Sequence, residues 1–294
     1  MFLRIFLGPD GIRAGWRWLI YLVFAVAIIG VLFHFALHTF PWQIPDLRLG
    51  KMVPREVIFL FAALAAAWIM TKIERRPFRS YGLPWESSLW TRLSEGATWG
   101  LGAMTLVLLI LRAVHCFSFG AAELRGRQLL LYAPGWGFYF LLVALYEEFT
   151  FRGYSQFTLT TGMGFWPAAL LLSACFGVGH LANPGENWIG VFQVFLTGLL
   201  LCVALYRTGN LWFSVGLHGA WDWAETFLYG VPDSGFTFKG RLLDPTFHGP
   251  KWLTGGSAGP EGSIVTLLVE AAIIGLLMLR FPASPKTPQD AAHS

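Results

Sequence analysis

Residues 146–154 read YEEFTFRGY and place three charged side chains, Glu147, Glu148 and Arg152, in an otherwise strongly apolar part of the chain. A charged side chain at the centre of a membrane helix costs on the order of 2.5–3.5 kcal/mol on insertion scales. Three such residues within six positions are therefore expected to have a function.

Two further polar segments follow in apolar surroundings, FGVGH at residues 176–180 and HGAWD at residues 218–222. On a helix, His180 lies one turn after an aromatic ring, and His218 lies one turn before a carboxylate. An imidazole near a carboxylate can relay a proton, hold a water molecule or bind a metal. We expect the three polar segments to converge to form one buried active site.

The composition predicts a polytopic membrane protein. The 294 residues are 55% hydrophobic and only 13% charged, whereas soluble domains carry about 25% charged residues. The net charge of +4 is small, so nucleic-acid binding is not expected. About eight candidate spans, each near the roughly 20 residues that cross the hydrocarbon, give an all-α transmembrane helical bundle. They are residues 16–38, 55–72, 93–115, 134–152, 165–182, 188–206, 210–229 and 263–281.

The spans divide the chain into N-terminal helices (1–129), a catalytic core (130–229), a loop with the last span (230–281) and a tail (282–294). The tail is polar and rich in proline, which predicts disorder. The Gly/Pro-rich connection 230–262 is too long for a simple turn, and a surface loop is favoured over a re-entrant loop. Lys and Arg divide 12 to 9 between the two sides. This bias predicts cytoplasmic termini, at the plasma membrane if the source is bacterial.

The two adjacent glutamates are expected to have different roles. Glu148 and Arg152 are four residues apart, so they share a helix face and can form an ion pair. Glu147 lies about 100° around the helix and is left as a candidate general base. Together with the two histidines and Asp222, it makes a set of groups that can activate water and stabilise an oxyanion. This set favours amide hydrolysis.

The pattern Glu-Glu-x-x-x-Arg, then Phe-x-x-x-His, then His-x-x-x-Asn/Asp resembles the CPBP intramembrane proteases, also called the ABI family. These are relatives of the type II CAAX prenyl endopeptidase. The resemblance covers about residues 130–226, and the matching residues are Glu147, Glu148, Arg152, Phe176, His180, His218 and Asp222. It implies an α-helical membrane fold with the active site in an intramembrane cavity.

The resemblance also implies roles for these residues. Glu147 and His180 would activate the attacking water, and His218 with residue 222 would stabilise the oxyanion. The supporting residues would be Glu148, Arg152 and Phe176. An Asn amide can donate a hydrogen bond to an oxyanion, whereas an ionised Asp cannot. Asp222 is therefore expected to be protonated, to orient His218 or to help bind a metal.

Cofactor and substrate are open at this point. Glu147, His180 and His218 can form a zinc site with an open position for water, but metal-free activation of water is narrowly favoured. The substrate would be a peptide or membrane protein in the lipid bilayer, prenylated or not. One alternative is a non-catalytic immunity or scaffold protein of the same fold, although all seven motif residues are present. A proton-coupled transporter would show two repeated halves, and the sequence shows no such repeat.

Overall fold

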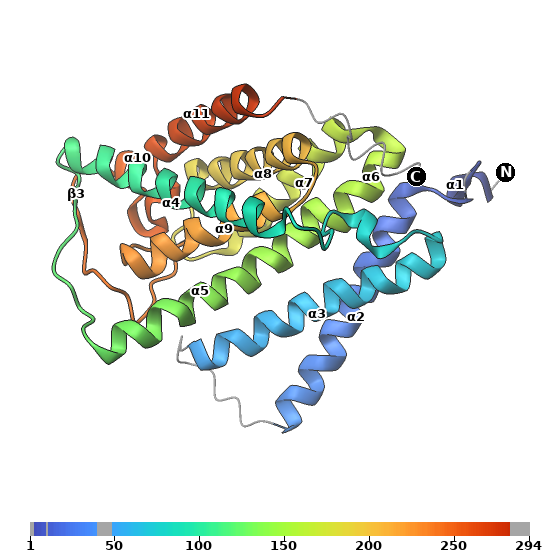
Figure 1. Cartoon of the computed structure of the whole chain (residues 1–294), viewed down its shortest axis with the longest axis horizontal. Helices are drawn as coiled ribbons and strands as arrows, with labels where there is room; N and C mark the ends of the chain where they lie inside the picture. Colours follow the sequence, from blue (N-terminus) through green and yellow to red (C-terminus); the bar gives the residue numbers. More distant parts are fainter. Residues whose placement is uncertain (1–2, 10, 40–48, 283–294) are drawn as a thin grey trace.

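The structure is a computed structural model that describes residues 3–9, 11–39 and 49–282. Apart from its first residue, the predicted tail at 282–294 lies outside the described residues. The described chain is helical nearly throughout (Figure 1), so the all-α prediction is confirmed. The long helices are α2 (Ala14–Thr39), α3 (Leu49–Glu74), α4 (Leu89–Ala113), α5 (Arg127–Glu148), α7 (Phe165–Gly179), α8 (Trp188–Thr208), α9 (Trp212–Trp223) and α11 (Ile264–Arg280).

Shorter elements connect the long helices. The short α-helices are α1 (Leu3–Phe6), α6 (Gln156–Met163) and α10 (Lys251–Thr254). The 3-10 helices are η1 (Phe78–Tyr81), η3 (His180–Ala182), η5 (Gly256–Ala258) and η6 (Pro260–Gly262), and the π-helices are η2 (Phe149–Ser155) and η4 (Ala224–Leu228). Two antiparallel pairs are formed by the two-residue strands β1 (Leu7–Gly8) with β2 (Gly11–Ile12) and β3 (Phe117–Ser118) with β4 (Thr246–Phe247).

All eight predicted spans coincide with helices. In the described part of the chain, six helical segments are long and apolar enough to cross a membrane: 14–36, 52–74, 89–113, 127–163, 165–182 and 188–208. The predicted seventh and eighth spans are helical but shorter, since α9 and η4 together cover 212–228 and α11 has 17 residues. That length is at the lower end of the range for a span. The fold is that of a polytopic membrane protein.

The fourth predicted span is longer in the structure than in the sequence analysis. The prediction ends it near residue 152, whereas α5, η2 and α6 continue as one helical segment over residues 127–163. The π-helix η2 follows α5 directly, and the helical segment is kinked inside it. Gly153, with φ −83° and ψ −111°, has the non-helical backbone angles inside η2. A Cβ there would lie 3.0 Å from the Phe149 ring, which leaves little room for a side chain.

Helices α4 and α9 pack closely along a row of glycines. A Cβ built on Gly96 would lie 2.0 Å from the carbonyl oxygen of Phe213, and one on Gly100 would lie 2.0 Å from that of Leu217. Small residues let helix backbones approach this closely in membrane proteins. The contact holds α9, which carries the third polar segment, against the rest of the bundle.

Replacing Gly100 with Ala is expected to lower the free energy of unfolding by about 1–3 kcal/mol, because the added methyl group overpacks the helix contact. Denaturant unfolding in mixed micelles measures this change. Gly102→Ala on the same helix is the matched control, because nothing lies within 4 Å of its Cβ and Ala favours a helix over Gly. Equal stability of the two variants would contradict a tight α4–α9 contact.

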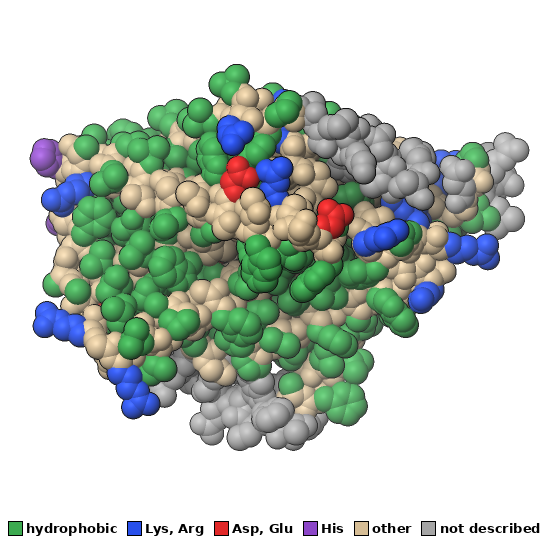
Figure 2. All heavy atoms as spheres, in the orientation of Figure 1, with side chains coloured by type: hydrophobic (Ala, Val, Ile, Leu, Met, Phe, Trp, Pro, Cys, Tyr) green, Lys and Arg blue, Asp and Glu red, His purple; other side chains and the backbone are tan. Residues whose placement is uncertain are grey.

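Large apolar side chains cover much of the molecular surface. Val23, Trp68 and Leu279 are 67%, 57% and 85% exposed. Figure 2 shows apolar side chains across most of the visible face, with Lys and Arg side chains toward its top and its two ends. Exposed apolar patches of this extent mark a surface that contacts lipid or another protein, and the helix lengths favour lipid.

Candidate active site

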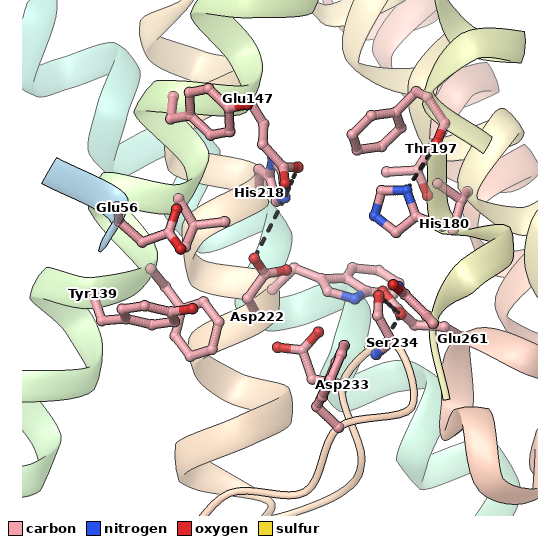
Figure 3. Close-up of a pocket in the computed structure, with 18 of the residues that line it drawn as sticks. Glu56, Tyr139, Glu147, His180, Thr197, His218, Asp222, Asp233, Ser234 and Glu261 are labelled. Atoms are coloured by element: carbon pink, nitrogen blue, oxygen red, sulfur yellow. Dashed lines mark hydrogen bonds and ion pairs between the residues drawn. The ribbon is translucent and has the colours of Figure 1, made fainter. Parts of the chain in front are cut away.

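A cavity of about 370 Å³ lies within the bundle (Figure 3). The four residues predicted to be catalytic, Glu147, His180, His218 and Asp222, all line it, together with the predicted supporting residue Phe176. They come from α5, from the end of α7 with η3, and from α9. The structure therefore brings the three polar segments to one place.

Glu148 and Arg152 form the ion pair that their spacing predicts. Arg152 Nη1 lies 3.1 Å from Glu148 Oε1, and the two side chains are 1% and 0% exposed. The guanidinium carbon of Arg152 also lies 4.4 Å from the centroid of the Phe176 ring, within the range of a cation–π interaction. The pair thus stands behind the cavity wall, where it neutralises one of the two adjacent glutamates.

His218 is surrounded by three carboxylates. Its Nδ1 lies 2.9 Å from Glu148 Oε1, while its Nε2 lies 3.4 Å from Asp222 Oδ2 and 3.7 Å from Glu147 Oε2. An ionised carboxylate only accepts hydrogen bonds, so Nδ1 carries the proton in the bond to Glu148. Nε2 is therefore the nitrogen that faces the cavity. The four-residue spacing predicts only the pairing of Glu148 with Arg152, whereas in the structure Glu148 also holds His218.

His180 is held in a comparable way. Its Nδ1 lies 2.8 Å from the carbonyl oxygen of Phe176, and a carbonyl oxygen can only accept. Nδ1 therefore donates, and in the neutral imidazole Nε2 keeps its lone pair. The His180 ring also packs edge-on at 4.7 Å from the Phe176 ring. An imidazole fixed in this way can accept a proton from a water molecule in the cavity.

These residues lie in a segment with known relatives. Residues 128–224 match the type II CAAX prenyl endopeptidase Rce1-like family. This segment, about a third of the chain, is similar to that family. The Rce1-like segment contains all seven motif residues, so the resemblance seen in the sequence is confirmed. A comparison with curated proteins gives no match.

The candidate zinc ligands of the Rce1-like segment do not converge on one point in this structure. Both histidines have the fixed Nδ1–H that metal-binding histidines usually show, and their chemistry would suit zinc. His180, however, lies across the cavity from His218 (Figure 3). Among the described residues, one group of three has ligand atoms that all lie within 4.8 Å of one another, and it consists of Glu225, Asp233 and Glu261. This arrangement therefore does not bring Glu147, His180 and His218 together as zinc ligands.

The cavity contains more carboxylates than the sequence analysis identified. Glu56 of α3 and Glu270 of α11 also line it, although they lie outside the Rce1-like segment. They are only 4% and 1% exposed. Each is an acidic residue within an apolar helix, so the energetic argument that drew attention to residues 146–154 also applies to them. Applied to single residues, that argument would have found both.

The connection 230–262 forms part of the cavity wall. Its contributing residues are Asp233, Ser234, Phe236, Phe238 and Glu261. These residues are partly or fully exposed, as a surface loop predicts, and they also line the cavity. Gly235 (φ +83°) shows how closely the connection packs, because a Cβ there would lie 1.8 Å from the carbonyl oxygen of Pro184. Glycine in this connection permits close packing against the segment that follows η3.

Proposed function

We propose that this protein is an intramembrane endopeptidase that hydrolyses a peptide bond of a membrane-associated peptide or protein. The observation that carries the proposal is the meeting of Glu147, His180, His218 and Asp222 at one cavity of a membrane-spanning fold. The match of this segment to the type II CAAX prenyl endopeptidase Rce1-like family supports a CAAX-type protease. Prenylated peptides are therefore the first substrates to test.

In the proposed reaction, Glu147 and His180 Nε2 hold a water molecule, and one of them takes a proton as the water oxygen attacks the scissile carbonyl carbon. The electron pair of the C=O bond moves onto oxygen and forms the oxyanion of a tetrahedral intermediate. When the intermediate collapses, the C–N bond breaks and the amine leaves with the proton that the base had taken. Atoms and charge balance without a metal.

His218 is the proposed oxyanion donor. With Nδ1–H bonded to Glu148, donation from Nε2 requires the imidazolium form. The surrounding carboxylates stabilise that cation, since Glu148 lies 2.9 Å from Nδ1 and Asp222 lies 3.4 Å from Nε2. In this proposal Asp222 orients His218, and it does not itself donate a hydrogen bond to the oxyanion. The Arg152 charge offsets the negative charge of Glu148.

The test is cleavage of quenched peptides, prenylated and unprenylated, by the purified chain in liposomes. We expect cleavage by wild type to be unaffected by phenanthroline, which binds zinc rather than oxygen-coordinated ions. His180→Ala is expected to lower kcat/KM by about 10²–10⁴-fold, the usual contribution of general acid–base catalysis. His248→Ala is the control, because His248 is exposed and outside the cavity lining.

Inhibition by phenanthroline that zinc reverses would show that the metal-free mechanism is wrong and would favour zinc binding by Glu147, His180 and His218. Equal cleavage by the two histidine variants would contradict the proposed role of His180. Absence of cleavage across a panel that covers both peptide classes would favour a non-catalytic protein of the same fold.

A further inference from the structure

A second group of carboxylates lies beside the proposed active site but takes no part in the proposed reaction. Ligand atoms of Glu225, Asp233 and Glu261 all lie within 4.8 Å of one another. They come from η4, from the connection that follows it, and from η6. All three lie outside the matched segment 128–224. We call Glu225, Asp233 and Glu261 the acidic triad.

The acidic triad receives hydrogen bonds from neutral donors. These bonds run from Trp221 Nε1 to Glu225 Oε2 (3.1 Å), from Thr226 Oγ1 to Asp233 Oδ2 (2.9 Å), and from Ser234 N and Oγ to Glu261 Oε2 (2.9 and 2.7 Å). Within the described part of the chain, no ion pair joins a triad member to Lys or Arg. Among the described residues, these three acidic groups are thus close together without a Lys or Arg paired to any of them.

The environment of Glu225 indicates what neutralises the negative charges of the acidic triad. It is 0% exposed, and its Oε1 is buried without a hydrogen-bond partner in the structure. Buried polar atoms are nearly always paired, and an exception indicates a missing water, ion or proton. Glu225 is thus a fully buried carboxylate with one unpartnered oxygen, and it is grouped with two other carboxylates.

Geometry and donor type identify the class of ligand. Three atoms that are no more than 4.8 Å apart can all lie within about 2.8 Å of one point, close to the 2.3–2.6 Å of calcium–oxygen bonds. Carboxylate oxygens select hard divalent cations, and calcium accepts irregular sets of 6–8 oxygens more readily than magnesium does. Asp233 and Glu261 line the cavity, so water can complete the coordination.

We propose that the acidic triad binds a divalent cation of the calcium class. The ion would join the end of η4 to two points of the 230–262 connection. Since η4 continues directly from α9, the ion would fix the connection against the helix that carries His218 and Asp222. The cavity wall formed by Asp233, Ser234 and Glu261 would then be held in place by the cation.

Protons are the alternative means of neutralising the triad. A proton on a carboxylate removes its negative charge, whereas a cation balances that charge. The experiment below distinguishes the two.

Terbium luminescence provides a direct test. Terbium substitutes for calcium in oxygen-donor sites, and its emission is sensitised by a nearby tryptophan; Trp221 lies 3.1 Å from Glu225. We expect the full chain in detergent, after chelator treatment and desalting, to sensitise terbium emission. We expect added calcium to displace terbium and so reduce that emission. Glu225→Gln and Glu261→Gln are each expected to weaken terbium binding at least about ten-fold, since even indirect partners of a metal site contribute 10–100-fold.

Glu270→Gln is the matched control, because Glu270 is a buried carboxylate of the same cavity that lies outside the triad. Its terbium affinity is expected to equal that of wild type. Calcium is also expected to raise the melting temperature of wild type and not that of Glu261→Gln. Either of two results would show that protons neutralise the triad. One is terbium binding that none of the triad substitutions weakens. The other is the absence of both calcium competition and a calcium-dependent shift in melting temperature. These readouts do not require cleavage, so they stand apart from the test of protease activity.

Discussion

Replacing Glu147 with Gln is expected to lower kcat/KM by about 10²–10⁴-fold, because Gln has the shape of Glu but cannot take a proton from water. The Glu147 side chain is 22% exposed and reaches the cavity beside His218, so the loss should arise in chemistry rather than in folding. The measurement is initial cleavage rate against concentration for the best substrate in the peptide panel, with the variant's melting temperature recorded alongside.

Glu270→Gln is again the matched control for this prediction, since it neutralises another carboxylate of the same cavity without touching the proposed reacting groups. We expect its kcat/KM to fall by less than about ten-fold, which is small beside the contribution of a general base. If Glu147→Gln kept wild-type kcat/KM, another group would have to act as the base. His180, whose Nε2 is free, would then be the first candidate.

Replacing Arg152 with Met is expected to lower the free energy of unfolding by about 3–5 kcal/mol, the usual cost of removing one partner of a buried ion pair. Glu148 is 0% exposed, and Arg152 is its cationic partner at 3.1 Å. Methionine replaces part of the apolar stem of arginine but none of its charge. Denaturant unfolding of the detergent-solubilised chain measures the change.

Arg92→Met is the control for the buried pair. Arg92 and Glu95 also form an ion pair, at 2.9 Å, but their side chains are 31% and 26% exposed. An exposed pair contributes about 0–1 kcal/mol, so this variant should unfold nearly as wild type does. Similar losses in the two variants would mean that the Glu148–Arg152 pair is much less important for stability than its burial implies.

The features of the fold and of the candidate site that depend on local sequence were predictable from the sequence. The cost of charge in a membrane indicated that Glu147, Glu148 and Arg152 matter, and the four-residue spacing predicted the Glu148–Arg152 ion pair that the structure contains. Apolar stretches of sufficient length gave the positions of the helices. These inferences succeed because each concerns residues within one or two helical turns.

Features that depend on distant segments were not predictable in the same way. The hydrogen bond between Glu148 and His218 joins residues 70 positions apart, and no spacing rule predicts such a contact. The acidic triad similarly joins η4 to a connection that composition alone suggests is a surface loop. Glu56 and Glu270 differ from these, since their sequence signal was present but weaker than that of three adjacent charges.

The π-helix η2 has a consequence for how the length of this segment can vary. A regular α-helix advances about 100° per residue, and a π-helical turn accommodates one additional residue within the helix. Deleting one residue from Phe149–Ser155 would shift the residues on one side of η2 by about 100° around the helix axis relative to those on the other side. A neighbour would then take the place of Glu147 at the cavity. The number of residues in this segment therefore sets the helical phase of the active site, independently of which residues they are.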